Sequence, residues 1–99
     1  MSLTFGTAVA GSVDPEVLDT GKALFQSGAT PACAVCHTLK DAGTSGTIGP
    51  DLDEMDLTVE TVKRTLIEGV GVMPSFAGSL SDAEMEAVAQ YVVHASGSD

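Results

Sequence analysis

The most reactive side chains of the 99-residue chain fall together in the stretch ATPACAVCHTLK, residues 29–40. This stretch holds both cysteines, Cys33 and Cys36, and one of the two histidines, His37. Thiol and imidazole groups serve proteins in metal binding, redox chemistry and the covalent attachment of prosthetic groups. Because the three side chains lie within five positions, one turn of chain could present all of them to a single centre.

Four interpretations compete for the motif CAVCH. Structural zinc needs four ligands, and only His94, near the C-terminus, remains to join the cluster. A thioredoxin-type redox pair expects a βαβ context, which the sequence pattern lacks. Two unrelated buried cysteines are the third interpretation. The fourth is the attachment signal of a c-type haem, C-x-x-C-H, and we favour it.

Haem attachment gives the spacing a mechanical reason. Two thiols three positions apart on a helical turn can each add to a vinyl group of haem, and His37 can then reach the iron. A chain this small buries proportionally little surface, and its composition, with no Trp, one Tyr and three Phe, supplies a thin core. We therefore predict haem c, attached through Cys33 and Cys36, as the apolar centre.

The iron would need a sixth ligand, and three of the candidates are disfavoured. Met85 lies in the apolar stripe of a predicted helix, where methionine usually serves core packing. Met55 follows His37 by only 18 residues, in an acidic stretch, which leaves little chain to pass around the ring. His94 lies near the end of the chain, where a surface position is expected. An iron without a sixth protein ligand is the remaining alternative.

Met73 is the favoured candidate. It lies in a predicted loop, 36 residues after His37, and Pro74 follows it directly. Proline fixes the local backbone and removes a donor, which helps a loop hold a thioether in place. We predict that His37 and Met73 are the two axial ligands.

Three segments have the periodicity of amphipathic helices. They are DPEVLDTGKALFQSG (residues 14–28), TVETVKRTLIEG (58–69) and SDAEMEAVAQYVVHAS (81–96). Asp14 can cap the first helix and Gly28 can end it, Gly69 can stop the second, and Ser81 with Glu84 forms a capping box for the third. The glycine-rich segments between them predict two long loops, at residues 40–52 and 69–80. No segment alternates as a strand does, so the predicted fold class is all-α.

At this length the chain is expected to form one domain. We assign residues 14–99 to it and residues 1–13 to an N-terminal extension, whose MSL start we interpret as a tag scar followed by a linker. Residues 1–12 lack the basic region and the apolar length of a signal peptide. We expect the native precursor to carry an export signal that is absent from this sequence. No apolar run approaches the roughly 20 residues of a membrane span.

The charge balance restricts the partners. The chain has 14 Asp and Glu against 4 Lys and Arg, a formal net charge of −10. Nucleic acid needs a basic footprint, so nucleic-acid binding is disfavoured. Such a charge suits a redox protein partner with a basic docking surface, although a merely solvated acidic surface is the alternative.

From residue 14 to residue 95 the chain resembles the small class I monohaem cytochromes c, the family of soluble bacterial and photosynthetic electron carriers. The segment GKALF resembles the N-terminal helix, CAVCH the haem site, IGPDL the loop behind the proximal histidine, and VMPSFAGSLSDAEMEAVAQYV the methionine loop and last helix. The resemblance implies the cytochrome c fold, in which three main helices and their loops surround one covalent haem. It also implies that Gly21 and Phe25 cross the last helix near Tyr91.

The resemblance further implies roles around the haem. Pro50 would offer its carbonyl to the second nitrogen of His37 and fix the ring. Five side chains would pack against the haem: Leu52, Ile48, Leu66, Val72 and Phe76. One departure is the absence of a Trp to bind a haem propionate, for which Arg64, Lys63 or backbone amides could substitute.

A haem iron with both His and Met bound has no open coordination position, so one-electron transfer is the expected chemistry. The favoured function is therefore a diffusible, monomeric electron carrier rather than an enzyme. Periplasmic localisation is expected, because haem attachment in bacteria takes place outside the cytoplasmic membrane. The alternatives are a haem subunit or domain dedicated to one oxidoreductase, and a ligand-sensing haem protein with a labile Met73.

Overall fold

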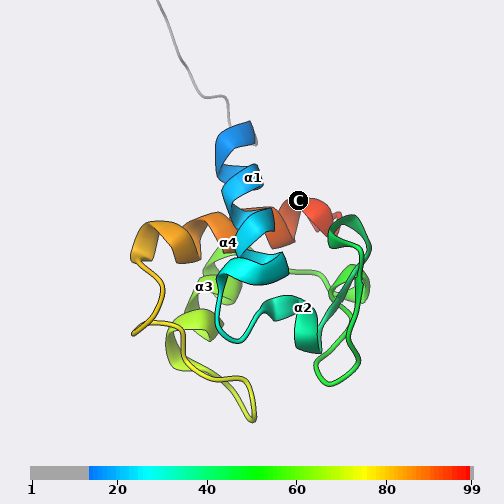
Figure 1. Ribbon diagram of the computed structural model, residues 1–99. Coiled ribbons are helices and arrows are strands. Elements are labelled where there is room, and N and C mark those ends of the chain that lie inside the picture. The colour runs from blue at the N-terminus through cyan, green and yellow to red at the C-terminus, as the bar shows by residue number, and fades with distance from the viewer. Residues whose placement is uncertain (1–13, 99) are drawn as a thin grey trace, which may run out of the picture.

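The computed structural model describes residues 14–98, so the predicted extension at residues 1–13 lies outside the described part. The described residues form the α-helices α1 (Pro15–Ala23), α2 (Cys33–Cys36), α3 (Val59–Glu68) and α4 (Asp82–Ala95). Figure 1 shows α1 crossing α4, with α3 on the other side of α4. The predicted all-α class is confirmed, and the three main helices are α1, α3 and α4.

The helices begin and end where local chemistry favours it. The Asp14 carboxylate accepts from the Glu16 N–H at 2.9 Å and caps α1. The Ser81 hydroxyl accepts from the Glu84 N–H at 3.0 Å while the Glu84 carboxylate accepts from the Ser81 N–H at 2.8 Å. These contacts form the predicted capping box of α4. Helix α3 ends at Glu68, and Gly69 follows it with a φ of +73°, a conformation that glycine adopts without strain.

The first helix changes type before it ends. The α-helix proper ends at Ala23, and the chain continues as one π-helical turn, Leu24–Gly28. Its wider turn is closed by the Ala29 N–H, which donates to the Leu24 carbonyl at 3.0 Å. The sequence predicted one helix to Gly28; the end point is confirmed, and the π-turn is new.

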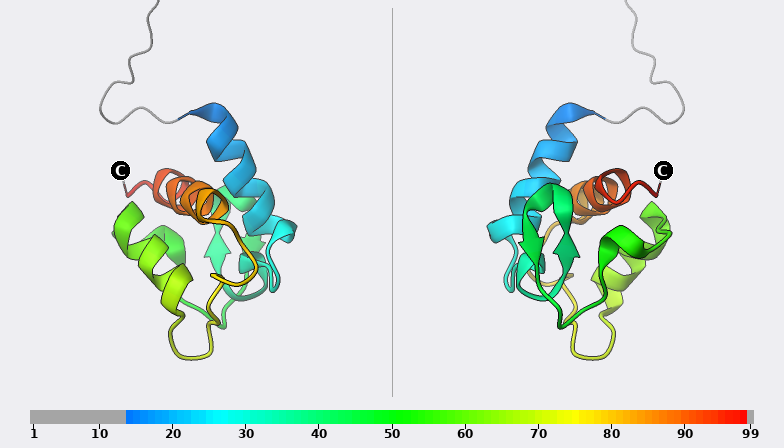
Figure 2. Two further views of the ribbon diagram at one scale, coloured as in Figure 1. Left: turned by 90° about the vertical axis from the view of Figure 1, so that its left-hand side faces the viewer. Right: turned by 90° about the vertical axis from the view of Figure 1, so that its right-hand side faces the viewer.

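The first long loop contains a small hairpin that the sequence did not predict. Strands β1 (Thr38–Leu39) and β2 (Thr44–Ser45) pair antiparallel, and the short 3-10 helix Lys40–Ala42 joins them. Two-residue strands are too short to show alternation, which explains why the sequence pattern missed them. Figure 2 shows this hairpin beside α1 and α4. A second 3-10 helix, Leu52–Glu54, follows it.

The most extensive helix packing lies where α1 and α4 cross. A Cβ atom built on Gly21 would lie 2.6 Å from the Tyr91 Cβ, so the two helices approach more closely than a side chain would allow. The Phe25 ring meets the Tyr91 ring edge-on, with centroids 6.0 Å apart. The crossing that the resemblance implied is therefore present. The α1–α4 crossing leaves α3 and the long loops available to enclose a separate cavity.

Candidate functional site

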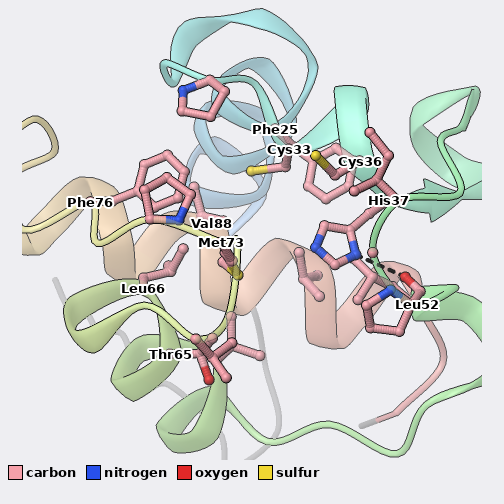
Figure 3. Close-up of a pocket in the computed structure, with 18 of the residues that line it drawn as sticks. Phe25, Cys33, Cys36, His37, Leu52, Thr65, Leu66, Met73, Phe76 and Val88 are labelled. Atoms are coloured by element: carbon pink, nitrogen blue, oxygen red, sulfur yellow. Dashed lines mark hydrogen bonds between the residues drawn. The ribbon is translucent and has the colours of Figure 1, made fainter.

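A cavity of about 400 Å³ lies between α2, α3, α4 and the two long loops. Figure 3 shows Cys33, Cys36, His37 and Met73 at this cavity. None of the described residues that line it is an Asp, Glu, Lys or Arg, and apart from the cysteines the polar side chains among them are His37, Thr61 and Thr65. The cavity is therefore suited to a large apolar group rather than to a polar substrate.

Helix α2 presents the two thiols. It is a single turn in which the His37 N–H donates to the Cys33 carbonyl at 3.0 Å. Residues three positions apart on a helical turn share one side, so both sulfur atoms lie toward the cavity (Figure 3). Burial raises the pKa of the Cys33 thiol to about 11, which keeps this thiol protonated at neutral pH.

The His37 ring is held from behind. Its Nδ1 lies 2.8 Å from the Pro50 carbonyl oxygen. Because a carbonyl can only accept, Nδ1 carries the proton of the neutral ring and Nε2 keeps its lone pair. This is the arrangement that prepares an imidazole to bind a metal. The contact that the resemblance implied for Pro50 is present in the structure.

Met73 is half-buried and its backbone is anchored on both sides. Val70 and Met73 exchange two backbone hydrogen bonds, of 3.0 and 2.9 Å, which close a tight turn. The Phe76 N–H donates to the Leu66 carbonyl at 2.7 Å and ties the loop to α3. Figure 3 shows the Met73 sulfur in the cavity, across from the His37 ring. The loop therefore holds the thioether where a group inside the cavity can meet it.

The other predicted contact residues also line the cavity, but they divide into two sets. Leu52, Leu66 and Phe76 are buried and form its interior wall. Ile48 is 68% exposed and Val72 is 87% exposed, so these two lie at the rim. Their contact with a bound group stays a prediction.

Met85 and Met55, the other two methionines considered as ligands, differ in burial and in position. Met85 is 5% exposed and belongs to the hydrophobic core, as its position in the apolar stripe predicted. Met55 is 39% exposed and also lines the cavity, a position that the sequence did not predict.

Several wall residues were missed as site residues. Val62 and Thr65 of α3 and Val88 and Val92 of α4 line the cavity. Val62, Val88 and Val92 belong to the apolar faces expected of these helices, and such a face does not show whether it meets another helix or a cofactor. The apolar pattern was therefore visible in the sequence, and it could have been used to predict that these three valines line the site.

Lys63 forms ion pairs with residues of α4 and does not line the cavity. Its ammonium lies 3.3 Å from an Asp82 carboxylate oxygen and 3.1 Å from a Glu86 oxygen, both on α4. The suggestion that Lys63 binds a propionate is therefore not supported by its contacts. Arg64 is likewise absent from the cavity lining.

The residues present fit a haem of the c type. Two thiols lie at the cavity, an imidazole with a fixed tautomer lies beside them, and a soft thioether lies across from it. Imidazole nitrogen and thioether sulfur are both ligands that haem iron accepts in proteins. Apolar walls suit the porphyrin. The fold and the site together define a c-type cytochrome.

Comparison with known proteins agrees. Residues 16–92 match the family described as "Cytochrome C oxidase, cbb3-type, subunit III", and the chain belongs to this family of small class I monohaem cytochromes c. It is 31% identical to cytochrome c-551 of Halorhodospira halochloris over 74% of this chain and 94% of that protein. It is 34% identical to cytochrome c6 of Cladophora glomerata over 81% of this chain and 90% of that protein.

A solved structure is similar over nearly its whole length. The c-type cytochrome SorU from Sinorhizobium meliloti matches with a TM-score of 0.81 and 40% identity, over 85% of this chain and 95% of that chain. The predicted family and the cytochrome c fold are therefore confirmed.

Family membership identifies the cofactor and the kind of function. The cofactor is haem c, attached through Cys33 and Cys36. The protein transfers electrons with this haem and is an electron carrier rather than an enzyme, so its partners are redox partners. Within residues 14–98 no helix has the length and apolar character needed to cross a membrane.

Proposed function

We propose that the protein is a diffusible periplasmic carrier of single electrons whose haem iron is bound by His37 and Met73. The observation that supports this proposal is the placement of the Met73 sulfur and the His37 ring across one apolar cavity. Haem c supplies a one-electron iron couple in such a site. With His37 and Met73 both holding the iron, exogenous ligands would have no ready access.

The chain's own residues would contribute in three ways. The Pro50 carbonyl holds the His37 ring in one orientation and increases its basicity. The anchored Met73 loop offers a neutral, soft donor, which favours ferrous iron and raises the potential compared with a second imidazole. The buried side chains of Leu52, Leu66 and Phe76 exclude water. The low polarity that results is one of the factors that set the reduction potential of a haem.

The cellular part of the proposal rests on chemistry and charge. Residues 14–99 act as one monomeric cytochrome domain in the periplasm, where c-type haems are attached in bacteria. The net charge of −10 favours a redox partner with a basic docking surface. The exposed Ile48 and Val72 at the cavity rim would be part of the area that such a partner approaches.

A second candidate has a specific observation in its favour. The matching family is described as a subunit of an oxidase, so the chain could serve one oxidoreductase as its haem subunit or haem domain. Electron transfer to washed membranes and to the soluble periplasmic fraction of the source cells would separate the two. A carrier exchanges electrons with a partner that it leaves again, whereas a dedicated subunit stays with one complex through gel filtration.

The Met73→Ala variant of the haem-loaded protein tests the ligand assignment. It should lose the weak far-red absorption band that methionine ligation gives ferric haem. The midpoint potential should fall, because water or an added base replaces the thioether. Imidazole or cyanide should bind readily, whereas the wild type should resist both.

Met85→Ala and Met55→Ala are the matched controls. Met85→Ala removes a buried core side chain and should lower the free energy of unfolding by about 2–5 kcal/mol while keeping the band. Met55→Ala should keep both band and potential. If Met55→Ala loses the band and Met73→Ala keeps it, the ligand assignment is wrong. A wild type without the band would favour the ligand-sensing alternative.

A further inference from the structure

Residues 46–50 run directly behind the haem-attachment turn, Cys33–His37, and are bonded to it at two points and to the next residue, Thr38, at a third. The Thr38 hydroxyl donates to the Gly46 carbonyl at 2.9 Å. The Gly49 N–H donates to the Cys36 carbonyl at 2.7 Å, and Nδ1 of His37 donates to the Pro50 carbonyl at 2.8 Å. This segment, residues 46–50, therefore follows the backbone of the attachment turn and ends on the imidazole ring.

Two glycines make this close approach possible. A Cβ atom on Gly49 would lie 2.6 Å from Cε1 of the His37 ring, 2.9 Å from Nδ1 and 3.0 Å from Nε2. A Cβ atom on Gly46 would lie 2.7 Å from the Val35 carbonyl oxygen and 2.9 Å from the backbone nitrogen of His37. Real Cβ atoms do not approach other atoms so closely. A side chain at Gly46 would meet backbone atoms and push the segment away from the turn, whereas a side chain at Gly49 would displace the segment or tilt the His37 ring.

Backbone conformation does not explain these glycines. The described glycines with positive φ are Gly43, Gly69, Gly71 and Gly97. Gly46 and Gly49 are not among them, so their φ angles do not require glycine. The reason for glycine at both positions is the space that the attachment turn and the His37 ring already occupy.

We propose that Gly46 and Gly49 are positioning residues for the axial imidazole. The proposal rests on the proposed function, in which His37 binds the iron. Gly49 lies on the ring and restricts its tilt, and Gly46 lets the segment lie against the turn. Only from that position does the Pro50 carbonyl reach Nδ1. The three contacts together hold the ring in the same orientation in both oxidation states, which reduces rearrangement when an electron moves.

The variants Gly49→Ala and Gly46→Ala, made in the haem-loaded protein, test the assignment. Gly78→Ala is the matched control, because a Cβ there meets no atom within 4 Å and its φ is not positive. The primary measurement is solvent exchange of the His37 Nδ1 proton, followed by NMR in the ferrous protein. Weakening the contact with Pro50 should speed this exchange at least about tenfold in Gly49→Ala, and Gly78→Ala should leave it unchanged.

Two further measurements distinguish positioning from general destabilisation. The ferric EPR g-values report ring orientation and should shift in Gly49→Ala and, to a smaller extent, in Gly46→Ala. In the wild type, a nuclear Overhauser contact should join the Gly49 Hα to the His37 Hε1. This last measurement needs no variant, so the absence of this contact would overturn the proposal even if both alanine variants fail to fold.

The possible results separate this proposal from the proposed function. Wild-type exchange and wild-type EPR in a folded Gly49→Ala would overturn it, and so would a missing Gly49–His37 contact in the wild type. The far-red band of the wild type tests methionine ligation independently. If that band is absent while the contact and the exchange effect are present, the positioning role stands and the proposed ligand pair fails.

Discussion

Among single residues, Asp41 joins three parts of the molecule that lie far apart in the sequence. It belongs to the short 3-10 helix that follows β1, and its carboxylate accepts from the Tyr91 hydroxyl of α4 at 2.7 Å. The Lys22 ammonium of α1 lies 3.6 Å from the same oxygen. The Tyr91 hydroxyl and, to a lesser extent, Lys22 hold the pKa of the Asp41 carboxyl below its usual range. Burial and the neighbouring carboxylate raise the pKa of Tyr91.

Tyr91→Phe should lower the free energy of unfolding by about 1 kcal/mol at pH 7, since Asp41 is half exposed and solvent screens the contact. A carboxyl with a lowered folded-state pKa stabilises the fold above its unfolded pKa of about 4, and this contribution disappears as the pH falls through the folded value. The difference between wild type and variant should therefore shrink below about pH 4. Thermal unfolding followed from pH 7 to pH 2 measures it. A difference that is constant over this range would contradict the assignment.

The residues of the site differ in how far their sequence neighbours reveal them. Cys33, Cys36 and His37 were predicted because their chemistry depends on local spacing, which a sequence states directly. Met73 was chosen with the help of the neighbouring Pro74, and its role stays a prediction. Gly49 could not be recognised, because the ring that it touches is twelve positions away and only the folded chain brings the two together.

Among the helices, α4 depends most visibly on its capping box. It runs from Asp82 to Ala95, and it packs against both α1 and α3. Ser81 and Glu84 satisfy two N–H groups that the first turn would otherwise leave without a helical partner. Because α4 contributes to the core and to the cavity wall, its first turn affects both.

Ser81→Ala should lower the free energy of unfolding by about 1 kcal/mol, the usual cost of removing an N-cap hydroxyl. Ser79→Ala is the control, because the Ser79 hydroxyl makes only a long contact of 3.5 Å with the Phe76 carbonyl. Urea unfolding of the two haem-loaded variants measures both values. Equal stability of the two variants would show that the cap contributes nothing to α4.

The helix boundaries explain what a sequence can and cannot predict about this fold. The caps at Asp14 and Ser81 and the stop at Gly69 were predictable, because each depends on residues within one turn. The π-turn Leu24–Gly28 was not predictable from the sequence. Its i to i+5 hydrogen bond is closed by Ala29, and Ala29 is held in place by its burial in the core of the folded chain. The hairpin of β1 and β2 depends on contacts with the attachment turn, among them the Thr44 hydroxyl donating to the His37 carbonyl at 2.9 Å.

At the scale of the whole molecule, a run of acidic residues lies near one side of the cavity. Residues 51–60 contain five acids and no Lys or Arg: Asp51, Asp53, Glu54, Asp56 and Glu60. Met55, in the middle of this segment, lines the cavity. Glu54 and Asp56 are exposed on either side of it. A cation that approaches the cavity from this side therefore meets a negative potential, which is the basis for expecting a basic partner.

The double variant Glu54→Gln with Asp56→Asn should slow electron transfer to a triply charged cation such as tris(phenanthroline)cobalt(III). Screened Coulomb attraction over roughly 10 Å predicts a decrease of about 5-fold at 0.1 M salt. Glu16→Gln with Asp19→Asn removes the same charge from exposed positions on α1 and should have a smaller effect. Stopped-flow oxidation of the ferrous protein measures all three rates.

Raising the salt concentration should slow electron transfer from the wild type to the cation and speed electron transfer to ferricyanide, because screening weakens attraction in the first case and repulsion in the second. Equal effects of the two double variants would mean that only net charge matters and that residues 51–60 do not direct a partner to the haem.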